Sequence, residues 1–278
     1  MLRTFAGATG LALFVCLWFT ATAQSASPIK DKNLEAAIRA VLFDPKGDLT
    51  DEMLKNVFIL NATGKPGKEI KDLTGLEKCT NLAEFKASNN QITDLKPLKE
   101  LSSLQSLDLS SNQISDIGPL AGLTKLQYIE LSKNKVADIS ALKNLTAISA
   151  LYLSENQIAD LSPLAGLGKL SSLSLSTNKV KNLSPLAKVD RLMVLDLNEN
   201  EIVDISPLNS QRELSKLMLA KNKITDLSAL VTAAEADAKG AKRFAPFLLL
   251  WLAGNPLSED AKAKQLPALK AAGVRIQD

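Results

Sequence analysis

Histidine is absent from this chain of 278 residues, so acid–base or nucleophilic chemistry would depend on its carboxylate, hydroxyl and thiol groups. A Ser-His-Asp triad and a zinc site with imidazole ligands are therefore excluded. The chain also contains neither a Gly-x-Ser-x-Gly elbow nor the Gly-Lys-[Ser/Thr] step of a phosphate-binding loop. These absences predict a protein that is not an enzyme and that uses no metal and no cofactor.

Carboxylates recur at one position every 22 residues. The members of this column, one of them an amide, are Asp94, Asp116, Asp138, Asp160, Asn182, Asp204 and Asp226. Such a set could suggest paired catalytic acids or calcium ligands. Each member, however, directly precedes Leu or Ile and often a Ser-Pro-Leu step, where a short helical turn would begin. An oxygen acceptor there satisfies the free N–H groups of the turn, so we interpret the column as capping residues.

Charge and cysteine content limit the class of protein. The 33 Lys and Arg residues against 30 Asp and Glu residues give a net charge of +3, which is too balanced for a nucleic-acid-binding protein. With 46% hydrophobic residues, the chain can bury one sizeable core. Cys16 lies in a segment that we expect to be removed, which leaves Cys79 as the only thiol. We expect Cys79 to be a small buried apolar residue rather than a reactive one.

Residues 1–23 have the three parts of a secretory signal. Arg3 is followed by an uncharged apolar run, and the segment ends in Ala21-Thr22-Ala23, which is a small-x-small cleavage site. We predict cleavage after Ala23 and a secreted, periplasmic or cell-envelope protein without a membrane span. Retention of the run as an anchor is the alternative, because a bilayer core needs about 20 apolar residues.

From residue 68 onward the chain is one repeat. An Asn recurs every 22 residues, except that the last interval is 33 residues long. The members of this column are Asn90, Asn112, Asn134, Asn156, Asn178, Asn200, Asn222 and Asn255. The Leu-x-Leu step ahead of each Asn predicts a strand whose leucines point inward. Because a buried amide can pair the backbone groups that the next turn leaves free, we interpret the Asn column as a structural ladder.

One stretch of nine residues carries a more specific motif. Residues 112–120 read Asn-Gln-Ile-Ser-Asp-Ile-Gly-Pro-Leu. This motif and the 22-residue period resemble the bacterial leucine-rich repeats of the internalin family and of the related phosphatase-regulator subclass. The resemblance implies an α/β repeat fold, a right-handed solenoid with a curved parallel sheet on the concave face and short 3-10 turns on the convex face. It also implies an extracellular or envelope-exposed recognition protein without enzymatic activity.

Four segments follow from these patterns: a signal at 1–23, a helical cap and linker at 24–67, the repeats at 68–257, and a C-terminal cap at 258–278. In the first cap, the spacing of Leu34, Ile38, Val41 and Leu42 predicts one apolar helical stripe, and Thr50 predicts the start of a second helix.

The irregular interval before Asn255 has 11 extra residues, which fall within 228–244. This alanine-rich stretch predicts a longer helix that ends at Gly240. In the C-terminal cap we predict a short helix over 259–272, broken at Pro267, and a closing strand over 274–276.

The outward side chains of the strands form the candidate binding face, because solenoids commonly bind partners on their concave surface. The candidate partner-binding residues are Glu84, Lys86, Asp108, Tyr128, Glu130, Tyr152, Asp196, Met218 and Trp251. All the Tyr and Trp residues beyond the signal fall on this face, and aromatic residues are enriched in binding hot spots. Tyrosine is also a good strand former, and Trp251 could be covered by the C-terminal cap, so both interpretations stay open.

We therefore expect a monomeric, non-catalytic binding module that recognises a protein or peptide through the concave face. An envelope scaffold that uses its ends or its convex side is one alternative. A module for carbohydrate or peptidoglycan, with the aromatic side chains stacked on sugars, is the other.

Overall fold

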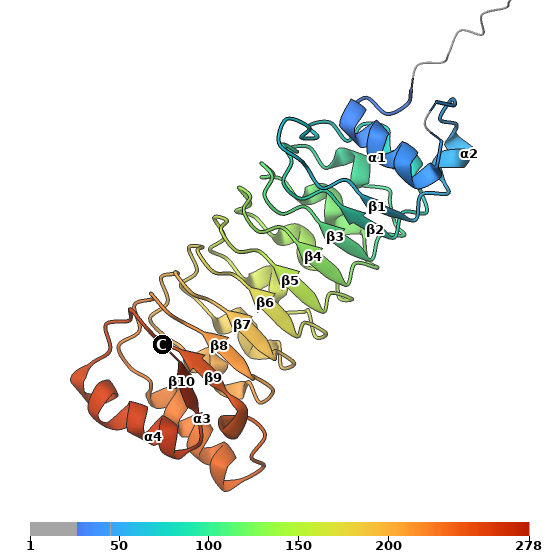
Figure 1. Cartoon of the computed structure of the whole chain (residues 1–278). Coiled ribbons are helices and arrows are strands. Elements are labelled where there is room, and N and C mark those ends of the chain that lie inside the picture. Colours follow the sequence, from blue (N-terminus) through green and yellow to red (C-terminus); the bar gives the residue numbers. More distant parts are fainter. Residues whose placement is uncertain (1–26, 45, 278) are drawn as a thin grey trace, which may run out of the picture.

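The computed structural model describes residues 27–44 and 46–277, so the predicted signal at 1–23 lies outside the described residues. Ten parallel strands form one open sheet in the order of the sequence (Figure 1). The strands are β1 (Ile59–Asn61), β2 (Glu84–Lys86), β3 (Ser106–Asp108), β4 (Tyr128–Glu130), β5 (Ala150–Tyr152), β6 (Ser172–Ser174), β7 (Val194–Asp196), β8 (Lys216–Met218), β9 (Leu249–Trp251) and β10 (Arg275–Gln277). The predicted solenoid is confirmed.

The central side chain of each repeat strand points into the core. These residues are Phe85, Leu107, Ile129, Leu151, Leu173, Leu195, Leu217 and Leu250, and all of them are buried. Neighbouring strands pair in register, as where Leu151 of β5 lies between Ile129 and Leu173. Since each repeat covers the apolar side of the next, the stack buries one continuous core along its whole length.

Short 3-10 turns form the opposite side of the solenoid. They are Leu76–Lys78, Lys96–Leu98, Gly118–Gly122, Ser140–Leu142, Ser162–Leu164, Ser184–Lys188 and Ser206–Ser210, and a further turn at Ala245–Phe247 precedes β9. The predicted capping column is confirmed at the six turns from Lys96–Leu98 to Ser206–Ser210. The Oδ1 atom of Asp160, for example, accepts a hydrogen bond of 2.8 Å from the N–H of Ser162, the first residue of its turn.

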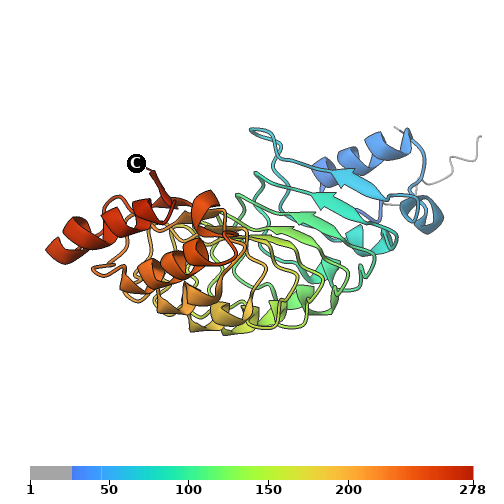
Figure 2. The ribbon, with the colours of Figure 1, turned by 90° about the horizontal axis from the view of Figure 1, so that it is seen from below.

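The strands lie on the inner side of a shallow arc, and the 3-10 turns lie on its outer side (Figure 2). This is the expected geometry of a solenoid whose strand side is narrower than its helical side. The sheet therefore presents its exposed side chains on a concave face.

The residue before each Asn of the ladder has a left-handed backbone. These residues are Asn89, Ser111, Lys133, Glu155, Thr177, Glu199 and Lys221, with φ between 54 and 60°. Only Gly takes this conformation without a steric cost, and Gly254, with φ of 78°, has the corresponding place before Asn255. Sequence analysis did not identify this column.

Two helices cover the N-terminal end of the sheet, α1 (Lys32–Leu42) and α2 (Asp51–Leu54) (Figure 1). Thr50 caps α2, as predicted, because its hydroxyl accepts the N–H of Met53 at 3.3 Å. The predicted apolar stripe of α1 is wrong at Val41, which is 36% exposed, because that side of the helix faces away from the first repeat.

The sheet also begins inside the segment assigned to the cap and linker. Strand β1 pairs with β2 so that Leu60 lies beside Phe85, and the loop after β1 continues the pairing through Gly64 N–H to the Ser88 carbonyl at 2.8 Å. The linker is therefore a degenerate first repeat, in which Leu60 and Ala62 are buried like the leucines of later repeats.

The insertion forms α3 (Ser228–Lys239), and the C-terminal cap contains α4 (Leu266–Ala271) before β10. The predicted break at Pro267 is wrong, since the helical path is continuous from residue 259 to 271. A π-helical turn at Ala261–Gln265 precedes the proline. Its wider spiral accommodates a residue that lacks an N–H, so the chain bends into α4 instead of ending.

Candidate functional site

The candidate binding face consists of the first and third side chains of the strands, on either side of each buried central residue. Glu84 and Tyr128 are first residues, and the other seven candidates are third residues of their strands. Lys86 is exposed, and the other eight are half-buried. All nine predicted residues therefore lie on the same face of the sheet.

Two tyrosines meet near the middle of this face. The ring centroids of Tyr128 and Tyr152 are 5.6 Å apart, and the ring planes are inclined by 47°. The pair is diagonal, because the residue opposite Tyr152 in the register is Glu130. Both values fall within the geometry that aromatic side chains prefer, so the two rings support each other and present one aromatic surface.

Two carboxylates border the tyrosine pair. Asp108 and Glu130 are register partners on β3 and β4. Burial raises the pKa of Glu130 above its usual value, and the charge of Asp108 adds to the rise, although hydrogen bonding to Ser132 opposes it. Burial and the neighbouring charges of Glu130 and Asp108 likewise raise the pKa of Tyr128 to about 12. Tyr128 is therefore a neutral phenol beside two carboxylates at physiological pH.

On β2, the first strand of the repeats, the charges of the face are paired, unlike those beside the tyrosines. The Lys86 ammonium and the Glu84 carboxylate form an ion pair of 2.6 Å, so Glu84 does not add free negative charge to the face. Within residues 27–44 and 46–277, no ion pair involves Asp108 or Glu130. Asp108 is the register partner of Lys86 on one side and of Glu130 on the other, but the Lys86 ammonium makes its ion pair with Glu84.

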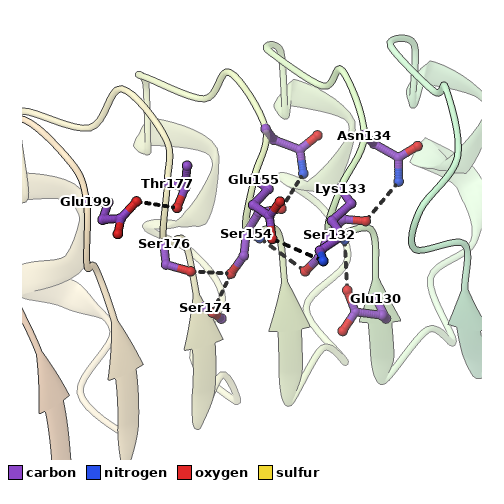
Figure 3. A network of polar contacts seen from close by, with 11 residues as sticks. Glu130, Ser132, Lys133, Asn134, Ser154, Glu155, Ser174, Ser176, Thr177 and Glu199 are labelled. Carbon is purple, nitrogen blue, oxygen red and sulfur yellow. Dashed lines mark hydrogen bonds and ion pairs between the residues drawn. The ribbon is translucent and has the colours of Figure 1, made fainter.

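Serine hydroxyls form a hydrogen-bonded network (Figure 3), and one of them, Ser174, is the register partner of Tyr152. The Ser154 and Ser174 hydroxyl oxygens are 2.6 Å apart, and the Ser176 hydroxyl donates to that of Ser154 at 2.9 Å. The Ser174 hydroxyl also donates to the Asp196 carboxylate at 3.3 Å. Because the serines bond mainly to one another, they form a narrow polar surface that leaves the tyrosine rings accessible.

The apolar end of the face lies further along the sheet. Met218 lies opposite Asp196 of β7 in the register. Trp251 lies opposite Gln277 of β10. Trp251 is half-buried, so the added strand β10 covers it in part and leaves the rest of the indole exposed. Four strand spacings, roughly 19 Å, separate β5 from β9, and Trp251 therefore does not join the tyrosine pair.

The Asn ladder lies at the edge of the sheet and ties neighbouring repeats together. Asn156 donates to the carbonyls of Leu131 and Leu153, both at 3.0 Å, and its Oδ1 accepts the N–H of Val136 at 2.9 Å. The same bonds recur along the column. Each Asn uses its amide within the backbone, which leaves no free donor for a ligand.

Charged side chains of the left-handed column form ion pairs along the same edge. Lys133 pairs with Glu155 at 3.5 Å, and Lys221 pairs with Glu199 at 2.6 Å. Sequence reasoning missed these pairs, although their 22-residue spacing ahead of the ladder Asn was a readable signal. They form a charged rim beside the candidate face.

Two of the larger cavities lie away from the tyrosine pair. One of about 480 Å³ is beside Ala36 and Phe43 of the N-terminal cap, and one of about 470 Å³ is beside Arg191 and Met193. In the described part of the chain, no group of three carboxylate or thiol side chains could hold a metal ion. The same residues include no helix of the length and apolarity that a bilayer crossing requires.

Comparisons with known proteins agree with this architecture. Residues 102–144 and 149–188 match the family model of leucine-rich repeats in two copies. Internalin C2 of Listeria monocytogenes has 33% sequence identity and a TM-score of 0.70, over 73% of this chain and 92% of that chain. A comparison with curated proteins found no match.

Two further structures are similar in fold alone. The functional domain of InlJ from Listeria monocytogenes is 24% identical, with a TM-score of 0.59 over 83% of this chain and 52% of that one. A leucine-rich repeat protein of Leptospira interrogans is 21% identical, with a TM-score of 0.62 over 82% and 62% of the two chains. The repeat pattern, the open parallel sheet and the similarity to internalin C2 together show that this chain belongs to the internalin-like leucine-rich repeat proteins of bacteria.

Proposed function

We propose that this protein is an exported, non-catalytic module that binds a protein or peptide partner through the concave face of its sheet. The observation that carries the proposal is the contact between Tyr128 and Tyr152, whose ring centroids are 5.6 Å apart on the exposed side of the sheet. Two half-buried aromatic rings on a solvated face have no core to stabilise. They are, however, the side chains that binding hot spots favour.

The size of the face supports a protein or peptide as the partner. Ten parallel strands about 4.8 Å apart span roughly 43 Å, which matches an extended segment of about 13 residues or one side of a small domain. The face is also rigid, since every central strand residue from β2 to β9 is buried in one core. A preformed rigid surface costs little conformational entropy when a partner binds.

Export is proposed from the sequence of residues 1–23, with its apolar run and its Ala21-Thr22-Ala23 site. The absence of catalytic function is proposed from the kind of surface that the candidate residues form. Asp108 and Glu130 lie on an open sheet rather than at the bottom of a cleft that could exclude water and position a substrate.

The test is capture of envelope and culture-medium proteins by the purified protein, compared with the double variant Tyr128→Ala/Tyr152→Ala. Phe247→Ala is the matched control, because Phe247 is an exposed aromatic residue outside the strands. Circular dichroism and thermal unfolding first establish that each variant folds. We expect a partner that wild type and control retain and that the double variant loses. Equal capture by all three proteins would assign binding to the caps or the convex side and contradict the proposal.

Two additions make the test specific. A photoreactive residue at Ser174, on the concave face, should crosslink the partner, whereas the same residue at Ser140, in a convex turn, should not. Protease treatment of the extract should abolish capture. If capture survives it, and purified peptidoglycan is bound, the carbohydrate alternative replaces the proposal.

A further inference from the structure

We infer that the patch around Tyr128 and Tyr152 receives a basic side chain, an arginine above all, that the partner presents to the concave face. The inference rests on the proposed function for the existence of a protein partner. It adds the chemistry of the group that the partner places on the tyrosine pair.

Negative charge is in excess at this place. The charged side chains of β2, β3 and β4 on the concave face are Glu84, Lys86, Asp108 and Glu130. They comprise three carboxylates and one ammonium, and that ammonium is held by Glu84 at 2.6 Å. In the register, Asp108 lies between Lys86 on β2 and Glu130 on β4, so the two carboxylates are direct neighbours. Like charges opposite each other on adjacent strands are destabilising, so the free protein retains an unfavourable arrangement here.

Each of these carboxylates has an unused oxygen. The Oδ1 atom of Asp108 accepts the N–H and the hydroxyl of Ser110 at 3.0 and 2.8 Å. The Oε1 atom of Glu130 accepts the N–H of Ser132 at 2.8 Å. Within the described residues, the other oxygen of each carboxylate accepts no hydrogen bond from the protein. Local bonds to serine fix the two groups in place, while one acceptor of each stays available to a ligand.

The aromatic rings complete the arrangement. Glu130 follows Tyr128 by two residues on β4 and is the register partner of Tyr152 on β5, so it is a neighbour of both tyrosines. A cation beside Glu130 would therefore also contact an aromatic face, which attracts it through the ring quadrupole. The burial that raises the pKa of Glu130 is the same desolvation that strengthens attraction to a partner cation.

Arginine fits this surface better than lysine. Its planar guanidinium can stack on a tyrosine ring while its N–H groups donate to a carboxylate at the ring edge. Lysine offers a compact and strongly hydrated charge, which makes the ion pair but not the stacking contact.

The protein provides a clean probe for a test, because Tyr128 and Tyr152 are its only tyrosines. The protein is labelled with ¹³C in the tyrosine rings and titrated with acetyl-Gly-Ser-Arg-Ser-Gly-amide. A second peptide has citrulline in place of arginine, which keeps the shape and removes the charge. A third has lysine.

We expect saturable shifts of both ring signals with the arginine peptide, at least tenfold weaker binding of the citrulline peptide, and intermediate binding of the lysine peptide. Glu130→Gln and Asp108→Asn should each weaken binding of the arginine peptide about tenfold. Asp204→Asn is the matched control, because it removes one charge from a convex turn where Asn182 already serves the same purpose. Equal binding of arginine and citrulline peptides, unchanged binding by Glu130→Gln, or no saturable shift in the millimolar range would each overturn the inference.

Partner capture separates this inference from the proposed function. If the partner depends on the two tyrosines but is held equally well by Asp108→Asn/Glu130→Gln, the concave face binds a partner whose contacting group is not basic. The proposed function then stands and the inference fails. If the arginine peptide binds as expected and no partner depends on the tyrosines, the basic-group site stands and the proposed function fails.

Discussion

The side-chain amide of Asn156 donates a hydrogen bond of 3.0 Å to the carbonyl of Leu131, 25 residues earlier in the chain. The contact joins the loop after one strand to the end of the preceding strand. It therefore acts between repeats, and the same bond recurs for the other ladder Asn residues.

Replacing Asn156 by alanine should lower the free energy of unfolding by about 3 kcal/mol, because buried backbone N–H and C=O groups lose their partners. The affected groups are the Val136 N–H and the Leu131 and Leu153 carbonyls. Urea unfolding followed by circular dichroism measures the loss. Asn144→Ala is the control, since Asn144 is exposed. A ladder role is contradicted if both variants unfold at the same urea concentration.

Thr177→Asn should stabilise the protein by about 0.5–1 kcal/mol, because asparagine tolerates the left-handed conformation better than a β-branched residue. Thr177 has φ of 55°, and Asn89 occupies the equivalent place in an earlier repeat. The variant gives up an exposed hydrogen bond of 3.3 Å from the Thr177 hydroxyl to Glu199. Thermal unfolding of Thr177→Asn and Thr177→Val separates the effect of backbone strain from the effect of losing the hydroxyl hydrogen bond. Backbone strain predicts that only the asparagine variant gains, whereas loss in both would point to the hydroxyl bond.

Asp237→Asn should destabilise the C-terminal cap by about 2 kcal/mol at neutral pH, since an amide nitrogen would replace one acceptor oxygen. The buried Asp237 carboxylate accepts the N–H groups of Arg243, Phe244 and Ala245 at 2.9–3.1 Å. Burial would raise its pKa, but these hydrogen bonds outweigh burial and lower the pKa below its usual value.

The pH dependence of that loss has a definite sign. A lowered pKa in the folded state contributes stability above the unfolded-state pKa of about 3.9, and the contribution disappears as the pH falls through the folded-state value. The difference between wild type and Asp237→Asn should therefore be constant from neutral pH to about pH 5 and shrink below about pH 4. A difference that stays constant down to pH 2 would contradict this role of the carboxylate.

Cys79 should not react with a thiol reagent in the folded protein at neutral pH. The residue is fully buried, and burial raises its pKa to about 12. Colour development with a disulfide reagent should be the same for wild type and Cys79→Val until denaturant is added. Since the unfolded thiol ionises near pH 8.5, the wild type should also lose stability relative to Cys79→Val as the pH rises from about 9 toward 12. Rapid reaction of one extra thiol in native wild type would refute the assignment.

Tyr152→Ala should reduce the free energy of unfolding by only about 1 kcal/mol, the contribution of an aromatic pair on a sheet surface. Its ring contacts Tyr128 but lies outside the buried core. Differential scanning calorimetry against Asn156→Ala checks the contrast. A loss as large as that of the ladder variant would show that the ring is part of the packing and not of a free surface.

The sequence alone determined the architecture, because every repeat offers the same environment and therefore demands the same residue types. Asn112, Asn134 and Asn156 recur at 22 residues because each must pair backbone groups at the same turn. The inward leucines, the capping column with Asp160 and the helix within 228–244 were readable for the same reason. Strand β1 escaped detection because its loop departs from the period and contains no Asn of the ladder.

Tertiary structure decided which charged side chains of the face are unpaired and which side chains are exposed. Glu84 and Asp108 look alike in the sequence, yet one is paired with Lys86 and the other is not, since pairing depends on rotamers and on the neighbouring strand. The half-exposure of Trp251 was decided by β10, a strand that arrives from the C-terminal cap. The sequence lists which groups each repeat presents, but their charge balance and exposure depend on the chain that packs beside them.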